Sequence, residues 1–191
     1  MSSKRPKGSK MPIANMQELT VHELCEIYDA EHRFVEGQEE MVQMASDQDL
    51  QSSIQQHLEQ TRGHIQNLEQ VFDQLGEEPR RETNEVAQGL VSEAQEGIQE
   101  AQNDAIRNCA IVTAVIKVEH FEMGSYRGLL TGAEQMEQSE IANLLNENLR
   151  QEEETARIAE QSAPELIQQA MQQEGQEEGL IDKIKDKLRG E

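Results

Sequence analysis

Six polar side chains occupy positions that the helical periodicity of the sequence turns toward the protein interior. Each interrupts an apolar stripe, as Glu31 does between Tyr28 and Phe34. The set contains four glutamates and two histidines: Glu31, His57, His64, Glu119, Glu122 and Glu152. An unpaired charge in a core costs several kcal/mol, so a buried carboxylate must be protonated, paired with a cationic side chain or bound to a cation.

The inner stripes hold no lysine or arginine that could pair with these carboxylates. Carboxylate and imidazole are ligands that iron, manganese and zinc accept. The sequence therefore predicts a site for one or two divalent metal ions per subunit, with iron as the first choice. The competing interpretations are a cluster of protonated or water-bridged carboxylates and a helix rotated so that these residues are exposed. For His64, a core histidine hydrogen-bonded to a glutamate is an equally good interpretation.

The two halves of the chain repeat this arrangement. Glu31-His32 matches Glu119-His120, and residues 58–61 match residues 149–152. A bundle with pseudo-twofold symmetry places such residues at one depth, which is the plan of the di-metal carboxylate proteins. We expect His32 and His120 to be exposed, because each follows a candidate ligand by one residue and points about 100° away from it.

Two helices depart from the full di-metal plan. Thr61 stands where the second helix would supply a glutamate, and Thr155 and Ala156 stand where the fourth would supply a histidine or aspartate. A single ion, a weakly held second ion and a site that has lost its metal all remain open.

Four long helices must position these residues. The apolar periodicity predicts a first helix from a capping box at Thr20 and Glu23 to about Ala45, and a second from Leu50 to Leu75, stopped by Gly76 and Pro79. A third helix should begin near Asp104 and a fourth should end near Pro164. Residues 77–103 form a crossover with a short amphipathic helix. One long crossover between two hairpins is the connectivity of ferritin-like bundles.

Composition agrees with an all-α fold. The 191 residues are 35% hydrophobic and only 3% aromatic, and strong helix formers dominate the long stretches between the four prolines. The formal net charge of −21 argues against nucleic acid and anionic membranes as partners. No apolar run approaches the roughly 20 residues that a membrane span requires.

The rest of the chain divides into tails around the bundle of residues 16–163. Residues 1–15 form a basic arm that we expect to be disordered, residues 164–178 a Gln- and Glu-rich extension or linker, and residues 179–191 a short amphipathic helix. That last segment is either a docking tail for a protein partner or a frayed packing helix. The first ten residues lack the apolar stretch of a secretory signal. Cys25 and Cys109 lie far apart at helical apolar positions, which favours reduced core thiols. We therefore expect a cytoplasmic protein.

Four stretches carry a family resemblance. Residues 23–34, 57–76, 118–129 and 146–154 (ELCEIYDAEHRF, HLEQTRGHIQNLEQVFDQLG, VEHFEMGSYRGL and NENLRQEEE) resemble the YciE/YciF-type ferritin-like family of bacterial stress-associated proteins, over about residues 18–163. The resemblance implies a ferritin-like bundle with an extra crossover helix, a homodimer and a di-iron or similar centre. Its ligands would be Glu31, His57 or His64, Glu119, Glu122 and Glu152. It implies no established reaction.

Two functions follow as hypotheses. The first is a stress-associated metal protein that oxidises Fe(II) with oxygen or peroxide, with Glu119 or Glu122 bridging the ions. The second is a non-enzymatic helical bundle that serves as an interaction or scaffold protein, with a decayed metal site and a docking tail at residues 179–191.

Overall fold

The computed structural model describes the backbone of residues 13–189, and the surroundings of side chains as far as Gln176 and at residues 179 and 185. This part of the chain folds into five α-helices and no strand: α1 (Met16–Met44), α2 (Gln48–Leu75), α3 (Glu85–Glu100), α4 (Asp104–Gln135) and α5 (Ser139–Arg189). The expected all-α fold is confirmed.

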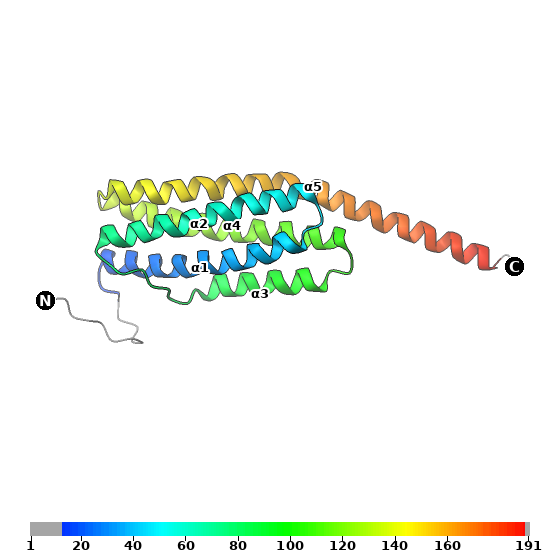
Figure 1. Cartoon of the computed structure of the whole chain (residues 1–191), viewed down its shortest axis with the longest axis horizontal. Coiled ribbons are helices and arrows are strands. Elements are labelled where there is room, and N and C mark those ends of the chain that lie inside the picture. Colours follow the sequence, from blue (N-terminus) through cyan, green and yellow to red (C-terminus); the bar gives the residue numbers. More distant parts are fainter. Residues whose placement is uncertain (1–12, 190–191) are drawn as a thin grey trace.

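The helices form two hairpins joined by a crossover (Figure 1). In the first hairpin α1 packs along α2, and in the second α4 packs along α5. The hairpins meet through contacts of α1 with α4 and of α2 with α5, while α3 lies against α1 and α4. This is the predicted ferritin-like arrangement, in which the crossover carries a short fifth helix on the outside of the bundle.

The first helix begins earlier than predicted. Asn15 is its N-cap, because the side chain of Asn15 accepts a hydrogen bond from the backbone N–H of Glu18. Thr20 lies inside the helix, where its hydroxyl donates to the backbone carbonyl of Met16. The predicted capping box at Thr20 and Glu23 was therefore wrong. A threonine within a helix can satisfy its hydroxyl in this way, and the spacing alone did not distinguish the two roles.

Two helices end in the same geometry with different residues. Gly76 follows α2 in the left-handed conformation (φ 70°), and Glu77 N–H donates to the carbonyl of Phe72. After α4, Glu137 adopts the same conformation (φ 57°), and Gln138 N–H donates to the carbonyl of Ala133. Both are Schellman ends. The Cβ atom of Glu137 makes this backbone conformation sterically unfavourable, whereas Gly76 has no Cβ and adopts it without strain.

The last helix differs most from the prediction. Residues 164–178, expected as an extension or linker, extend the fourth bundle helix. The separate helix expected at 179–191 is part of the same helix, because α5 continues through Pro164 to Arg189. Leu166 and Ala170 remain buried beyond the proline, and this packing holds the helix together where one backbone hydrogen bond is missing. Further on, α5 projects past the end of the bundle (Figure 1). The basic arm expected at residues 1–15 falls outside the described residues as far as residue 12.

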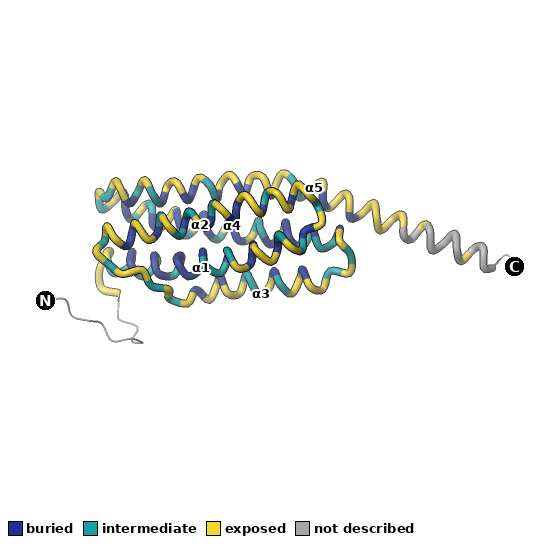
Figure 2. The backbone as a smooth tube through the Cα atoms, viewed as in Figure 1, coloured by how far each residue is buried: buried dark blue, intermediate teal, exposed yellow. Residues whose placement is uncertain are grey.

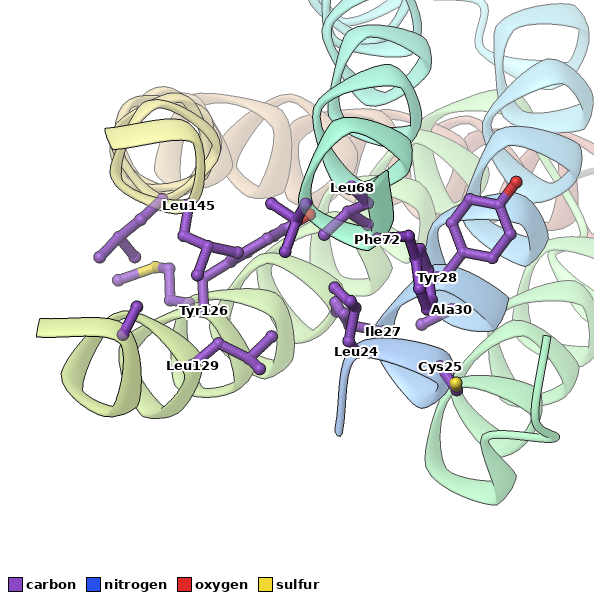
Figure 3. Close-up of a cluster of buried hydrophobic side chains, with 14 of the residues drawn as sticks. Leu24, Cys25, Ile27, Tyr28, Ala30, Leu68, Phe72, Tyr126, Leu129 and Leu145 are labelled. Carbon is purple, nitrogen blue, oxygen red and sulfur yellow. The ribbon is translucent and has the colours of Figure 1, made fainter. Parts of the chain in front are cut away.

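Buried residues lie on the sides of the helices that face one another (Figure 2). One apolar cluster contains Leu24, Ile27, Phe72, Tyr126 and Leu145, which converge from α1, α2, α4 and α5 (Figure 3). A second contains Ile54, Ile98, Ile111, Val112 and Leu166. On α2, the polar residues His57, Thr61 and His64 separate Ile54 of the second cluster from Leu68 of the first. The core therefore has a polar layer between two apolar ones.

Candidate metal centre

The polar layer is built from the six residues that the sequence singled out. α1 supplies Glu31, α2 supplies His57 and His64, α4 supplies Glu119 and Glu122, and α5 supplies Glu152. None is more than 3% exposed, and three of the glutamates are fully buried. The structure thus brings all six together, and the alternative of a rotated helix that exposes them was wrong.

The ligand atoms fall into two overlapping groups. His57, Glu119, Glu122 and Glu152 form one, and Glu31, His64 and Glu152 form the other. Within each group, one ligand atom from every residue lies within 4.8 Å of the others, a separation that one ion between them can span. Glu152 belongs to both groups, so its carboxylate lies between the two positions.

Short distances join the histidines to the carboxylates. His57 Nε2 lies 3.1 Å from Glu119 Oε1 and 3.5 Å from Glu152 Oε2. His64 Nδ1 lies 2.9 Å from Glu152 Oε1 and 3.6 Å from Glu31 Oε1. Each imidazole therefore presents one nitrogen to two carboxylates from different helices.

Most of these facing atoms make no hydrogen bond. Among the described residues, none forms one with His57 Nε2, His64 Nδ1, Glu31 Oε2, Glu119 Oε2 or either carboxylate oxygen of Glu122 and Glu152. The atoms lie close together but are not directed at one another as donors and acceptors. Eight buried polar atoms without hydrogen-bond partners are a costly arrangement, and a bound cation would lower that cost.

The outer nitrogen of each histidine is held by a neutral side chain. His57 Nδ1 lies 3.0 Å from the hydroxyl of Thr155 and 3.3 Å from Gln60 Oε1. His64 Nε2 lies 3.0 Å from Gln151 Oε1. In a neutral ring these contacts place the proton on the outer nitrogen, and the lone pair of the inner nitrogen then faces the carboxylates. Metal-binding histidines are oriented in the same way.

Glu31 is fixed by a chain of hydrogen bonds from Tyr126, Asn148 and Asn67. Tyr126 donates its hydroxyl to Glu31 Oε1. Asn148 Nδ2 donates to the Tyr126 oxygen at 3.0 Å, and Asn67 Nδ2 donates to Asn148 Oδ1 at 2.7 Å. Asn148 is fully buried and lies one helical turn before Glu152, so its position in an apolar stripe was a signal that could have identified it.

Thr61 occupies the position on α2 where the di-metal plan has a glutamate. Its hydroxyl donates to the carbonyl of His57 at 3.1 Å and faces the amide of Gln38, whose Nε2 lies 3.1 Å away. A neutral threonine and glutamine pair thus occupies the position where the di-metal plan has a carboxylate. One turn earlier on α2, Nε2 of His57 faces the carboxylates of Glu119 and Glu152.

Burial and the charges of neighbouring side chains shift the pKa values of the glutamates and histidines in the polar layer. Burial raises the pKa of Glu119 to about 8 although the nearby His57 lowers it, and burial with the charges of Glu152 and Glu31 raises that of Glu122 well above its usual value. Burial alone would lower the histidine values, but Glu119 and Glu152 raise the pKa of His57 to about 9. Glu31 and Glu152 likewise raise that of His64 to about 11. Without a cation, the layer therefore holds extra protons at neutral pH.

Three aromatic residues close to the candidate ligands in the sequence lie outside the polar layer: His32, His120 and Tyr28. His120 is exposed, as expected, and lies 2.8 Å from Glu160. His32 is half-buried, which differs from the prediction, because its ring packs edge-on against Tyr28 with centroids 4.7 Å apart. Tyr28 donates its hydroxyl to Glu69 at 2.9 Å and thus acts as a core residue with a satisfied hydroxyl.

None of the helices within residues 13–189 combines the length and apolarity that crossing a lipid bilayer demands.

Comparison with known proteins gives consistent matches. Residues 15–172 match the family model DUF892, described as a domain of unknown function. Protein YciF of Escherichia coli (strain K12) is 32% identical over 146 residues, which cover 76% of this chain and 88% of that protein.

Solved structures support the same relationship. The crystal structure of the Escherichia coli stress protein YciF matches with a TM-score of 0.78 and 29% identity, over 82% of this chain and 99% of that one. YcfI from Rhodopseudomonas palustris matches with a TM-score of 0.76 and 32% identity, over 78% and 94%. A protein from Xanthomonas campestris pv. campestris, at 20% identity and a TM-score of 0.66 over 84% and 99%, supports the fold alone. The chain therefore belongs to the YciF-type family, whose domain is described as DUF892.

Proposed function

We propose that this chain is a stress-associated metal protein that binds divalent ions, iron in the first instance, in the polar layer. The observation that carries the proposal is the convergence of eight buried polar atoms without hydrogen-bond partners, contributed by four helices. Carboxylate and imidazole donors of this kind suit iron, manganese and zinc. The similarity to a protein described as a stress protein supports the physiological setting, and a cytoplasmic location is part of the proposal.

The proposal has room for two ions. One position takes His57, Glu119 and Glu122, the other takes Glu31 and His64, and Glu152 serves both. We therefore propose Glu152 as the residue shared by the two ions, in place of Glu119 or Glu122, which the sequence suggested. The first position has more ligands than the second, so we expect it to be filled first.

The chemistry that iron supplies in such a site is electron transfer to oxygen or peroxide. The chain itself holds the carboxylates in place and orients both imidazoles through Thr155, Gln60 and Gln151. Tyr126 fixes Glu31 and keeps its own proton, since burial and the charge of Glu31 raise its pKa well above the usual value.

Metal uptake tests this proposal directly. Protein purified without chelators is analysed for bound elements and then titrated with Fe(II) under anaerobic conditions, followed by air. We expect one or two ions per chain and a change in absorbance on exposure to air. Glu152→Ala should lose the metal at both positions, because its carboxylate belongs to both groups.

Glu153→Ala is the matched control, because Glu153 is the next residue on the same helix and is exposed, with an ion pair to Arg127. It should bind metal as the unmodified chain does. A protein that takes up no Fe(II), Mn(II) or Zn(II), or that binds them equally well in the Glu152→Ala variant, would overturn the proposal.

A second candidate function rests on the projecting part of α5. Ile167 is 47% exposed and Met171 is 66% exposed, and they lie four residues apart on one face of the helix. Apolar side chains exposed at this spacing are typical of a helix that docks onto a protein partner or onto a second copy of the chain. A scaffold function, with the polar layer as a relic, would use this surface, and the expected homodimer is one form of it.

Light scattering and pull-down separate these outcomes. The full chain is compared with a chain that lacks residues 179–191 and with Met171→Glu. Loss of dimer or of a captured partner in both variants supports docking through α5. An unchanged mass and an unchanged set of captured proteins would remove the support for a docking role.

A further inference from the structure

A cavity of about 230 Å³ opens beside the polar layer. Residues from all five helices line it, and its buried walls are apolar, with Phe34 and Met41 from α1, Ile54 from α2, Ala94 from α3 and Ala159 from α5. An engineered cavity of roughly 150 Å³ with apolar walls accepts benzene. This cavity therefore has room for a larger apolar molecule.

The inner end of the cavity is formed by the polar layer itself. His57, Glu119 and Thr155 line it, and all three are buried. Two of them belong to the four-residue ligand group, and the hydroxyl of Thr155 holds the ring of His57. A molecule in the cavity would thus contact one of the two proposed ion positions and would not reach Glu31 or His64, which do not line it.

The mouth of the cavity is acidic. Among the lining residues the exposed ones include Glu40, Asp49 and Glu165, and Ile158 lies there with 37% of its surface exposed. Carboxylates at the mouth, on a chain whose formal net charge is −21, repel an anion. The electrostatics thus argue against fatty acids and other carboxylates as occupants.

We propose that this cavity binds an uncharged apolar small molecule, which lies with its inner end against His57 and Glu119. The cavity then supplies a binding site for an organic molecule next to the first ion position. Contact of this molecule with a bound ion rests on the proposed function, whereas its binding in the cavity does not.

Octan-1-ol is the probe, and the metal-free full chain is titrated with it by calorimetry. We expect saturable binding with one site per chain, and binding at least tenfold weaker for octanoate, which has the same alkyl length with a negative charge. Ala94→Phe fills the cavity from α3 and should weaken octan-1-ol binding at least tenfold. Ser92→Phe introduces the same ring on the same helix at an exposed position that does not line the cavity, and it should leave binding unchanged.

Several results would overturn the proposal: no saturable binding, equal binding in Ala94→Phe, or equal binding of octanoate. A chain that is dimeric and becomes monomeric in Ala94→Phe would assign the cavity to a second copy and would also overturn it. Contact between the bound molecule and the ion position is tested separately, by the absorption spectrum of the Co(II)-loaded chain. A spectrum that changes on adding octan-1-ol supports contact with the ion position, and an unchanged spectrum at saturation overturns that contact while metal binding stands.

Discussion

The hydroxyl of Thr155 lies 3.0 Å from Nδ1 of His57, and the other nitrogen of that ring faces Glu119 and Glu152. The threonine stands where the repeat of the two halves leads one to expect a ligand from α5. It acts instead through the histidine, because a contact on the outer nitrogen fixes the ring orientation and leaves the inner lone pair available.

Thr155→Val removes this contact with almost no change in volume. Loss of such a partner typically lowers metal affinity by about 10- to 100-fold, and we expect a decrease of that size at the first ion position. Thr155→Ser, which keeps the hydroxyl, should retain most of the affinity. Calorimetric titration with Mn(II) measures both variants, and equal affinities would show that Thr155 has no orienting role.

Glu122 offers a test of how costly the metal-free layer is. Both of its carboxylate oxygens are buried, and within the described residues neither has a hydrogen-bond partner. A buried polar group without a hydrogen-bond partner costs about 1–3 kcal/mol, so Glu122→Met, which removes two such oxygens, should raise the free energy of unfolding of the metal-free protein by about 2 kcal/mol. The same variant should bind less metal.

Chemical denaturation with a chelator present measures this change. Glu153→Met, at an exposed position of α5, is the control and should not stabilise the protein. A metal-free Glu122→Met protein that is less stable than the unmodified one would show that Glu122 has a structural role of its own.

The pH dependence of the metal-free protein follows from the raised pKa values. Burial raises the pKa of Glu119 from 4.5 to about 8, and the charges of Glu119 and Glu152 raise that of His57 from 6.5 to about 9. A group whose pKa is raised on folding contributes stability below its unfolded pKa and loses that contribution as the pH rises through the folded value. Both groups therefore predict that stability falls with rising pH, most clearly between about pH 6.5 and pH 8, where the two windows overlap.

Metal binding should show the opposite trend. The ligands must lose their protons before they coordinate an ion, so affinity increases with pH over the same range. Denaturation midpoints at pH 6 and pH 8.5, with chelator and with Mn(II), test both statements. Midpoints that do not change with pH in the chelated protein would show that the two groups are not perturbed in this way.

The end of α4 allows a stability test away from the polar layer. Glu137 adopts the left-handed conformation that Gly76 adopts after α2. That conformation costs a residue with a side chain roughly 1–2 kcal/mol, so Glu137→Gly should stabilise the protein by about 1 kcal/mol despite the flexibility that glycine adds to the unfolded chain. The reciprocal change, Gly76→Ala, should destabilise it by a similar amount, because a Cβ at Gly76 meets no atom within 4 Å and only the backbone is strained. Thermal unfolding of both variants, measured with chelator, gives the comparison.

The sequence was a good guide wherever periodicity decides the outcome. Helical spacing located α1, α2 and α4 to within a few residues, and it identified Glu31 and Glu152 as inward-facing because each interrupts an apolar stripe. It was a poor guide where tertiary contacts decide. Pro164 read as a boundary, but Leu166 is buried against the bundle and the helix continues.

The supporting residues of the polar layer show the same limit. In the sequence, Gln151 is an ordinary polar residue of a helix, and the position of Asn148 in an apolar stripe indicates that it is buried but not what it contacts. Only the packing of α2 against α5 brings Gln151 to His64, and that of α4 against α5 brings Asn148 to Tyr126. The cavity likewise depends on residues from five helices, so no local pattern predicts it.

Pro164 also has a mechanical consequence. Without an N–H at this residue, the carbonyl of Glu160 lacks its usual helical donor, and a helix bends most easily at such a turn. Pro164 lies twelve residues after Glu152, or about 18 Å along the axis. A bend of the outer part of α5 is therefore expected at this turn, more than three helical turns away from Glu152.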